Sequence, residues 1–373
     1  MIIDPLDAMT TAPTRLEINL AAIAANWRRV ASETPHGRAA AVVKADGYGC
    51  GAVPVGQTLY GAGARLFFTA HLSEALALRQ ALPQPDAEIG VFNGLLPGEA
   101  ESYRAHRILP VLNDLGQIEV WADFCRRQGI ALPACIQIDT GMRRLGLPPY
   151  EVETLRDETS RLAGIEFRYL LSHMAAGDDP AHALNMVQRD AFAAACSALP
   201  RPSGGTMLAA SSGAFLGPDY AFDWVRPGYA LYGGNPVPGR PNPMTPVVRL
   251  AARILQTRRI TRGDTVGYGA TWTAEKPSHI ATIALGYADG YLRSLSSRGV
   301  VHLDGTPIPV VGRVSMDLVT LDISAFPDSS PGLEVEVIGP HQGVDAVAEK
   351  AGTIGYEILT GLGARYARIY SGE

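Results

Sequence analysis

The chain has 373 residues, of which 47% are hydrophobic and 18% are charged, and its formal net charge is −5. This length exceeds what one hydrophobic core usually supports, so two domains are expected. The acidic balance argues against nucleic acid as the main partner, and no run of about 20 uncharged apolar residues predicts a membrane span. The N-terminal segment lacks the apolar stretch of a signal peptide and the four cysteines have no metal-like spacing, so we expect a cytoplasmic protein with free thiols.

Strand and helix patterns alternate through the first two-thirds of the chain. Each apolar run is continuous, which is typical of strands covered on both faces. Regular alternation predicts parallel strands, and about eight such units favour an α/β TIM (β/α)8 barrel over a doubly wound sheet. No GxGxxG motif opens a helix, which weakens the dinucleotide-binding alternative. The predicted strands are residues 39–45, 65–70, 87–93, 108–113, 133–139, 165–173, 206–211 and 221–226.

Helical patterns separate these strands. One helix is expected to start at an N-cap serine, Ser73, because Glu74 follows in the first turn and apolar residues then recur with helical spacing. The stretch from Pro180 to Leu199 is the longest amphipathic pattern in this part of the chain. The predicted helices are residues 20–33, 73–82, 98–107, 115–129, 149–162 and 180–199.

The pattern changes near residue 234. Residues 233–246 are rich in Pro, Gly and Asn, which is typical of an interdomain connector. Beyond it, alternating apolar and polar residues between Gly, Asp and Pro turns predict β-strands, with one helix. We therefore predict a barrel domain over residues 14–236 and a mostly β domain over residues 237–373, with the strand near residues 14–19 as a further element of either domain.

The segment AVVKADGYGCG, residues 41–51, is the most informative part of the chain. Apolar residues lead into Lys44, and burial of an ammonium group favours loss of its proton, which makes a lysine nucleophilic toward aldehydes. The glycines allow a sharp turn close to a ligand, and Tyr48 can offer a hydroxyl to an anion. Pyridoxal phosphate (PLP) is held by such a combination. A strand-ending lysine that reaches solvent before a glycine turn fits the segment equally well.

Chemically capable side chains follow several of the predicted strands. In a TIM barrel the active site lies at the carboxyl ends of the strands, so these side chains would meet at one mouth. Each alone has an ordinary structural explanation, such as a turn or a surface charge, and only their shared location favours a site. They are Lys44, Asp139, Met142, Arg143, Arg144, His173, Ser211, Ser212, Arg226, Gly228 and Tyr229.

With these motifs, the chain resembles the bacterial alanine racemases, a family of fold-type III PLP-dependent enzymes. The resemblance runs from about Thr14 to Tyr370 and is most specific in AVVKADGYGCG. It implies a PLP-binding barrel followed by a β domain, and a homodimer in which two subunits share each active site. Four further segments resemble motifs of the family: VGYGATW at 266–272, GYADGYLR at 286–293, VGRVSMD at 311–317 and TIGYE at 353–357.

The resemblance also implies roles for individual residues. Lys44 would hold PLP and act as one catalytic base, and Tyr268 of the partner subunit would act as the other. His173 and Arg226 would link that tyrosine to the cofactor, with Arg226 on the ring nitrogen. A guanidinium keeps its proton, so the ring nitrogen would stay unprotonated, which disfavours transamination and decarboxylation. The other implied contacts are Tyr48, Ser212, Gly228, Tyr229 and Tyr356 to the phosphate, Arg144 to the phenolic oxygen, Arg144 and Met316 to the substrate carboxylate, and Tyr287, Arg293 and Asp317 at the entrance.

These roles imply that two bases interconvert L- and D-alanine and that no metal takes part. The D-alanine would be used for peptidoglycan. Three departures from the family pattern bear on substrate preference and affinity more than on reaction type: Gln137 replaces a frequent lysine, Arg143 replaces a glycine, and Ser315 replaces a frequent cysteine. A broad-specificity amino-acid racemase is the closest alternative. A fold-type III decarboxylase fits less well because its glycine triplet and catalytic cysteine are missing, and PLP-carrier proteins lack the β domain.

Overall fold

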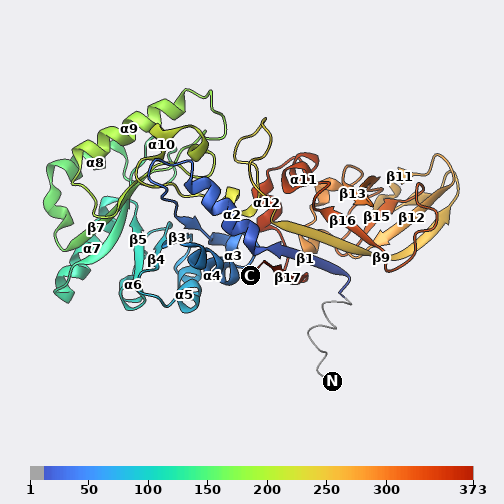
Figure 1. Ribbon diagram of the computed structural model, residues 1–373, viewed down its shortest axis with the longest axis horizontal. Coiled ribbons are helices and arrows are strands. Elements are labelled where there is room, and N and C mark those ends of the chain that lie inside the picture. The colour runs from blue at the N-terminus through green and yellow to red at the C-terminus, as the bar shows by residue number, and fades with distance from the viewer. Residues whose placement is uncertain (1–11, 373) are drawn as a thin grey trace, which may run out of the picture. The chain divides into compact units, whose positions relative to one another are not determined.

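A computed structural model describes residues 12–372, which form two compact units (Figure 1). The barrel unit comprises residues 23–231 and 235–244. Among the described residues, the β unit comprises residues 12–22, 232–234 and 245–372. Each unit has its own sheet, so each is described by itself below.

A seven-stranded parallel sheet forms the centre of the barrel unit, and its strands follow one another in chain order. The β3 and β5 strands are buried along their whole length, which explains why the sequence shows continuous apolar runs there. Parallel neighbours in chain order are what right-handed β-α crossovers produce. The strands are β2 Ala41–Val42, β3 Leu66–Thr69, β4 Glu88–Val91, β5 Ile108–Leu112, β6 Leu132–Gln137, β7 Ile165–Leu171 and β8 Gly205–Met207.

A short extended segment around Val225 closes this sheet into a barrel. Val225 forms a parallel bridge with Ala39, next to the first strand of the sheet, and Arg226 forms one with Ala210, after the last strand. The N–H of Arg226 also donates to the carbonyl of Ala209 at 2.9 Å. The predicted (β/α)8 barrel is therefore confirmed, with its eighth strand reduced to two bridges.

The helices of the barrel unit alternate with its strands. The sequence analysis missed α4, Ala52–Ala62, whose Pro54 lies in the first turn, where a proline is tolerated. The prediction that Ser73 caps the next helix was wrong, because His71 is the N-cap and its N–H donates to Glu74 Oε2 at 3.1 Å. The remaining helices are α2 Leu20–Ala31, α3 Lys44–Tyr48, α5 Leu72–Ala81, α6 Ala100–Ala105, α7 Leu115–Gln128, α8 Pro149–Asp157, α9 Leu184–Ala198 and α10 Pro218–Ala221.

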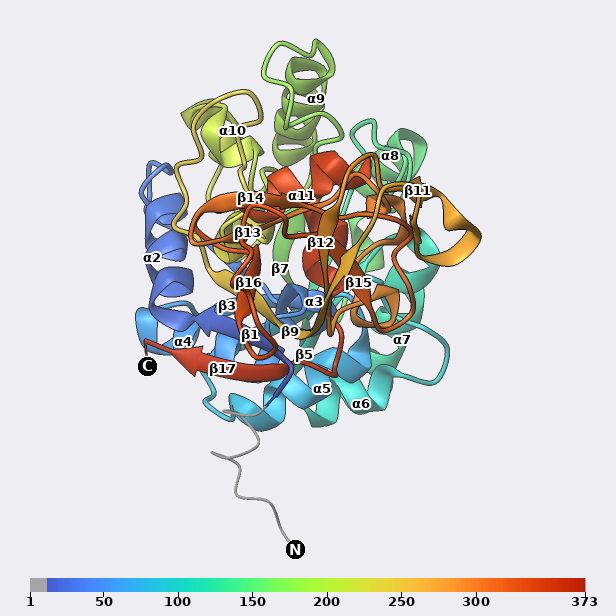
Figure 2. The same cartoon turned by 90° about the vertical axis from the view of Figure 1, so that its right-hand side faces the viewer.

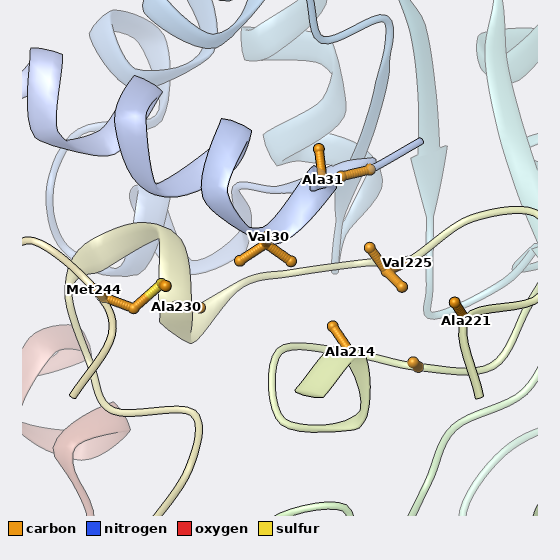
Figure 3. Packing of buried hydrophobic residues seen from close by; sticks show 9 residues of the cluster. Val30, Ala31, Ala214, Ala221, Val225, Ala230 and Met244 are labelled. Atoms are coloured by element: carbon orange, nitrogen blue, oxygen red, sulfur yellow. The ribbon is translucent and has the colours of Figure 1, made fainter. Parts of the chain in front are cut away.

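An apolar cluster packs the closing segment against α2 (Figure 3). Val30, at the end of α2, and Val225 are both fully buried in it, and Trp27 packs on its edge. The indole N–H of Trp27 donates to the carbonyl of Ala39 at 3.1 Å, so the helix is also tied to the start of the sheet. The other buried members are mostly alanines, which lets backbone segments approach closely: Ala31, Ala39, Ala209, Ala214, Ala221, Ala230 and Met244.

The β unit is built around one long strand, β9 Val248–Ile260, which pairs with β1, β12 and β16. The N-terminal strand β1, Thr14–Asn19, lies between β9 and β17, antiparallel to the first and parallel to the second (Figure 2). Buried and half-buried residues alternate along most of β1, as expected for a sheet with two unlike faces. The mostly β second unit is therefore confirmed.

Short strands and two helices complete the β unit. Helix α11 occupies Val344–Ala351, within the one helix that the sequence predicts in this region, and α12, Gly355–Thr360, follows it. The further strands are β10 Thr265–Val266, β11 Trp272–Thr273, β12 Ser278–Ile283, β13 Val300–Leu303, β14 Thr306–Pro309, β15 Val319–Asp322, β16 Glu334–Ile338 and β17 Ala367–Ser371.

Candidate active site

Lys44 opens a left-handed turn at the carboxyl end of the first barrel strand. The strand ends at Val42, three residues before the end of the predicted strand. Ala45, Asp46 and Tyr48 have φ values of 52°, 52° and 53°, a region that L-residues rarely adopt. Glycines 47 and 49 share the positive φ, which explains why the motif contains them. The turn places the lysine and tyrosine of AVVKADGYGCG at the mouth of the barrel.

The Lys44 amine lies in a partly desolvated and positively charged setting. Its Nζ lies 5.9 Å from the centroid of the Phe92 ring, and the side chain is half-buried. Burial, followed by the positive charge of Arg144, lowers the pKa of Lys44 below its ordinary value. Glu74 opposes this shift and Arg226 adds to it. A larger fraction of this amine is therefore neutral, and nucleophilic, near pH 7 than for an exposed lysine.

Tyr48 packs against the backbone at Gly228. A Cβ atom on Gly228 would overlap the Tyr48 hydroxyl and would lie 2.9 Å from its Cζ, so a larger residue would require the tyrosine or the backbone to move. The N–H groups of Gly228 and Ala230 donate to the Oγ of Ser211 at 3.0 and 3.1 Å. These contacts pack the backbone tightly on both sides of Tyr229, whose side chain is buried.

Of the two neighbouring serines, Ser211 makes these contacts. Its side chain is buried and accepts both N–H bonds, whereas Ser212 is half-buried at the start of a short 3₁₀ turn. The sequence pattern did not distinguish the two, because it does not show which hydroxyl points inward.

Arg226 is a buried guanidinium held by backbone carbonyls. It donates to the carbonyl of Met207 at 2.8 Å, to that of Ser172, and to Nδ1 of His173 at 3.5 Å. Burial lowers the pKa of Arg226 to about 10, so it remains protonated at neutral pH. Burial, together with the positive charges of Arg226, Arg144 and Lys44, lowers the pKa of His173 to about 3, so its ring is neutral.

A loop after β6 carries Arg144, which is exposed. Asp139 Oδ1 accepts from the N–H groups of Gly141 and Arg143 at 2.8 and 3.0 Å, which turns the chain tightly. The amide of Gln137 is nearly buried and donates to the carbonyl of Leu145, the residue after Arg144, at 3.1 Å. The amide that departs from the family pattern therefore ties down the backbone of this loop.

A buried glutamine that the sequence analysis did not single out connects two of these loops. Gln188, on α9, donates to Thr140 Oγ1 at 3.1 Å and to the carbonyl of His173 at 2.9 Å. Its Oε1 accepts from the N–H of Ala175 at 2.8 Å, and Thr140 shares a 2.8 Å hydroxyl contact with Ser172. The only sequence signal was a polar residue within an amphipathic helix, because its loop partners are 13 to 48 positions away.

The predicted site residues of the β unit lie at its surface. Tyr268 is 70% exposed, in the turn between β10 and β11. Tyr287 and Met316 are exposed and lie close in space, because the N–H of Tyr287 donates to the carbonyl of Ser315 at 3.0 Å. The other predicted site residues of this unit are also exposed: Arg293, Asp317 and Tyr356.

Asp317 belongs to an ion-pair network. Arg365 donates to Asp317 Oδ1 and to Asp289 Oδ1, both at 2.7 Å. Asp289 is buried, whereas Asp317 is exposed, so the arginine joins a structural carboxylate to a surface one. This geometry gives Asp317 a structural partner in addition to its predicted place at the entrance.

Two features of the described residues bear on other classes of function. Within residues 12–372, no group of three or more His, Cys, Asp or Glu side chains has the arrangement of a metal site. In the same range, no helix combines the length and apolarity that crossing a bilayer requires.

Comparison with known proteins covers nearly the whole chain. Residues 18–236 match the family described as "Alanine racemase, N-terminal domain", and residues 247–370 match "Alanine racemase, C-terminal domain". A catabolic alanine racemase of Agrobacterium fabrum is 49% identical over 96% of this chain and 92% of its own length. An alanine racemase of Methylobacterium sp. strain 4-46 is 49% identical over 95% of this chain and 97% of its own length.

Solved structures agree with these matches. Alanine racemase from Bartonella henselae with covalently bound pyridoxal phosphate superposes with a TM-score of 0.93, at 40% identity over 96% of this chain and all of that one. Alanine racemase from Bacillus anthracis with bound L-Ala-P has a TM-score of 0.85, at 28% identity over 97% of this chain and 96% of that one. With both domain matches in chain order and relatives 49% identical over nearly full length, the chain belongs to the alanine racemase family.

Proposed function

We propose that this protein is a PLP-dependent alanine racemase, which interconverts L- and D-alanine with one base on each face of the substrate. The observation that carries the proposal is the Lys44 amine at the mouth of the barrel, with its lowered pKa, near the buried Arg226 and neutral His173. The relatives that are 49% identical, and the structure from Bartonella henselae with bound PLP, support the reaction and the cofactor.

The lysine content of the chain supports Lys44 as the residue that holds PLP. The sequence contains three lysines, Lys44, Lys276 and Lys350, and only Lys44 belongs to the barrel unit. The barrel is the unit whose strand ends carry the other candidate site residues. A covalent link to an aldehyde cofactor in this unit therefore has one available amine.

The residues of the barrel unit fit the phosphate and the ring of PLP. Gly228 lets the Tyr48 hydroxyl approach the backbone more closely than a Cβ would allow, and Ser211 Oγ accepts from the N–H groups on either side of Tyr229. Backbone N–H groups and hydroxyls bind a phosphate dianion without a cluster of basic side chains. We assign Tyr48, Ser212, Gly228 and Tyr229 to the phosphate, as the resemblance implies, with Tyr356 as a further member.

The chain's own residues supply the protons and the charge for racemisation. Bound PLP supplies an electron sink that weakens the α C–H bond of an amino acid. The Lys44 amine, whose lowered pKa favours its neutral form, takes or returns the α-proton on one face. Arg226 remains protonated, so a ring nitrogen that it held would stay without a proton, which would limit the electron sink and disfavour side reactions. Arg144 and the backbone of Met316 would hold the substrate carboxylate.

The second base is Tyr268 of the partner subunit in this proposal. In its own unit this side chain is 70% exposed, so its hydroxyl is accessible to another chain. Neutral His173 can link a phenol to Arg226 by hydrogen bonds, because its Nδ1 accepts from the guanidinium and its Nε2–H can donate to the phenol oxygen. Tyr287, Arg293 and Asp317 would line the approach to the site. The product D-alanine would serve peptidoglycan synthesis.

Covalent trapping and two single substitutions test the proposal. Borohydride reduction followed by peptide mapping should find the cofactor on Lys44 and on neither Lys276 nor Lys350. Lys44→Ala should lose at least about a thousandfold in racemisation. In D2O, Tyr268→Phe should lose α-proton exchange of L-alanine far more than that of D-alanine, because Lys44 remains to serve the D-enantiomer.

Matched controls separate these roles from general damage. Tyr150 is 67% exposed in the barrel unit, so Tyr150→Phe should exchange both enantiomers as wild type does. Lys350→Ala should keep full activity. Equal exchange of both enantiomers in Tyr268→Phe would refute the two-base assignment. A panel of L-amino acids racemised as fast as alanine would favour a broad-specificity racemase, and carbon dioxide release would favour a decarboxylase.

A further inference from the structure

The turn that follows Lys44 requires external support. Residues 45–49 all have positive φ, and three of them are not glycine. The left-handed conformation is unfavourable for each non-glycine residue, and such segments persist only where their surroundings hold them. The structure must therefore contain contacts that compensate for this conformation.

Two carboxylates provide these contacts from side chains. Asp46 Oδ1 accepts from the N–H of Ala52 at 2.8 Å, which ties the turn to the start of α4. Glu74 Oε1 accepts from the N–H of Ala45 at 2.7 Å. Ala45 is the residue directly after Lys44, so Glu74 holds the backbone at the point where the lysine side chain departs.

The second oxygen of Glu74 holds the neighbouring strand. Its Oε2 accepts from the N–H groups of Ala70 and His71, at 2.8 and 3.1 Å, immediately after β3. One half-buried carboxylate therefore joins the ends of two adjacent barrel strands through three backbone N–H groups. Hydrogen bonds to an ionised acceptor are the stronger kind, and this geometry is more than a helix cap requires.

We propose that Glu74 is a positioning residue for Lys44: its carboxylate fixes the left-handed turn to the end of β3 and so holds the lysine amine over the Phe92 ring. This inference rests on the proposed role of Lys44 as the catalytic amine. The carboxylate also supplies the negative charge that opposes burial, Arg144 and Arg226 in setting the pKa of Lys44. The same side chain, Glu74, thus positions the Lys44 amine and places a negative charge near it.

The Glu74→Gln substitution distinguishes the role of one carboxylate oxygen from that of the other. The glutamine amide can accept through only one oxygen. We expect that oxygen to keep the hydrogen bonds from the N–H groups of Ala70 and His71. The NH2 group would then face the N–H of Ala45, and two donors cannot bond to each other. Amide hydrogen exchange of peptides covering residues 43–51 should become about tenfold faster, because the N–H of Ala45 loses its acceptor. In the holoenzyme, kcat should fall about tenfold, and the acidic limb of the pH profile of kcat, which reports groups of the substrate complex, should move to lower pH, because the negative charge that raises the pKa of Lys44 is gone.

A second variant and a control sharpen the test. Glu74→Asp keeps the charge but is too short to reach both strand ends. Amide hydrogen exchange at residues 43–51 should therefore become faster, while the acidic limb of the pH profile stays near its wild-type position. Glu151 is a half-buried carboxylate that accepts from the N–H of Leu115 at 3.1 Å in the same unit, so Glu151→Gln should change neither quantity.

The failure of this inference is distinguishable from failure of the proposed function. Wild-type exchange at residues 43–51 together with an unchanged pH profile in Glu74→Gln would overturn the positioning role, and the activity of Lys44 would stand. If borohydride trapped the cofactor elsewhere than on Lys44, the proposed function would fail, and the exchange experiment would still report whether Glu74 holds the turn.

Discussion

Nη2 of Arg226 lies 3.5 Å from Nδ1 of His173, and the two side chains carry different charges at neutral pH. The guanidinium is protonated because burial lowers its pKa only to about 10. The imidazole is neutral because burial and neighbouring cations lower its pKa to about 3. Nδ1 must therefore be the acceptor, and the proton of the ring lies on Nε2.

The His173 ring should remain neutral through the physiological range. Its C–H resonances should show no titration between pH 8 and pH 5 by NMR, with His173→Gln used to assign them. Since the folded-state pKa is below the ordinary 6.5, the unfolded chain takes up the proton first as the pH falls. The stability that the neutral ring contributes is complete above about pH 6.5 and falls toward pH 3, by up to about 1.4 kcal/mol per pH unit.

The corresponding control is an exposed histidine of the same unit, His36. His173→Gln should flatten the dependence of the unfolding free energy on pH between 6.5 and 5, whereas His36→Gln should leave it as in wild type. A His173 midpoint near 6.5 would contradict the neutral ring.

Arg226→Lys should retain the charge but lose the planar fork that reaches several carbonyls at once. One ammonium cannot occupy the positions of both guanidinium nitrogens that bind Met207 and Ser172, so a buried acceptor is left unpaired. We expect a loss of about 2 kcal/mol in the free energy of unfolding and at least a tenfold loss in racemisation. Denaturant unfolding and steady-state kinetics measure the two effects, and wild-type values for both would refute the role of the fork.

Gly228→Ala should weaken cofactor binding. The new Cβ would overlap the Tyr48 hydroxyl, so either the tyrosine or the backbone must move. The dissociation constant for PLP should rise at least tenfold, and Gly228→Ala should cost less in a Tyr48→Phe background, where the overlapping oxygen is gone. Gly61, in α4, has open space around it, so Gly61→Ala should bind PLP normally and gain up to about 1 kcal/mol in stability.

Arg79→Met should destabilise the barrel without changing its chemistry. The guanidinium is buried and donates only to backbone carbonyls, so its removal takes the donor from two buried bonds, to Leu82 and Ala87, and from three part-buried ones, at a cost of about 3 kcal/mol. Arg104, which pairs with Glu101 at the surface, is the control, and Arg104→Ala should stay within about 0.5 kcal/mol. An equal loss in both variants by denaturant unfolding would contradict this. The carbonyl acceptors of Arg79 belong to Leu82, Gln84, Ala87, His106 and Arg107.

Mixing two inactive variants should restore activity if subunits share a site. A heterodimer of Lys44→Ala and Tyr268→Phe chains contains one site with both bases intact. Random exchange makes about half of the dimers mixed, so recovery should approach about one quarter of the wild-type rate. Tagged chains can verify the exchange, and no recovery after proven exchange would mean that both bases come from one chain.

Continuous apolar runs made the barrel predictable from sequence. A strand covered on both faces has to be apolar along its length, and the regular alternation with helices leaves few topologies. The same argument located Lys44, His173 and Arg226, because parallel strands place their carboxyl ends at one mouth. The closing strand was harder to predict, because its identity depends on bridges from Val225 and Arg226 to distant partners rather than on its own composition.

The tertiary structure alone decided which polar groups meet. Glu74 looked like an ordinary residue in the first turn of a helix, and Gln188 like a polar position on an amphipathic one. Their partners lie 29 positions away for Glu74 to Ala45 and 48 for Gln188 to Thr140. A hydrogen bond between such residues depends on loop geometry and rotamers, which leave no periodic pattern in the chain. Apolar burial follows a period that the sequence displays, whereas polar pairing is set by contacts that form only when the barrel closes.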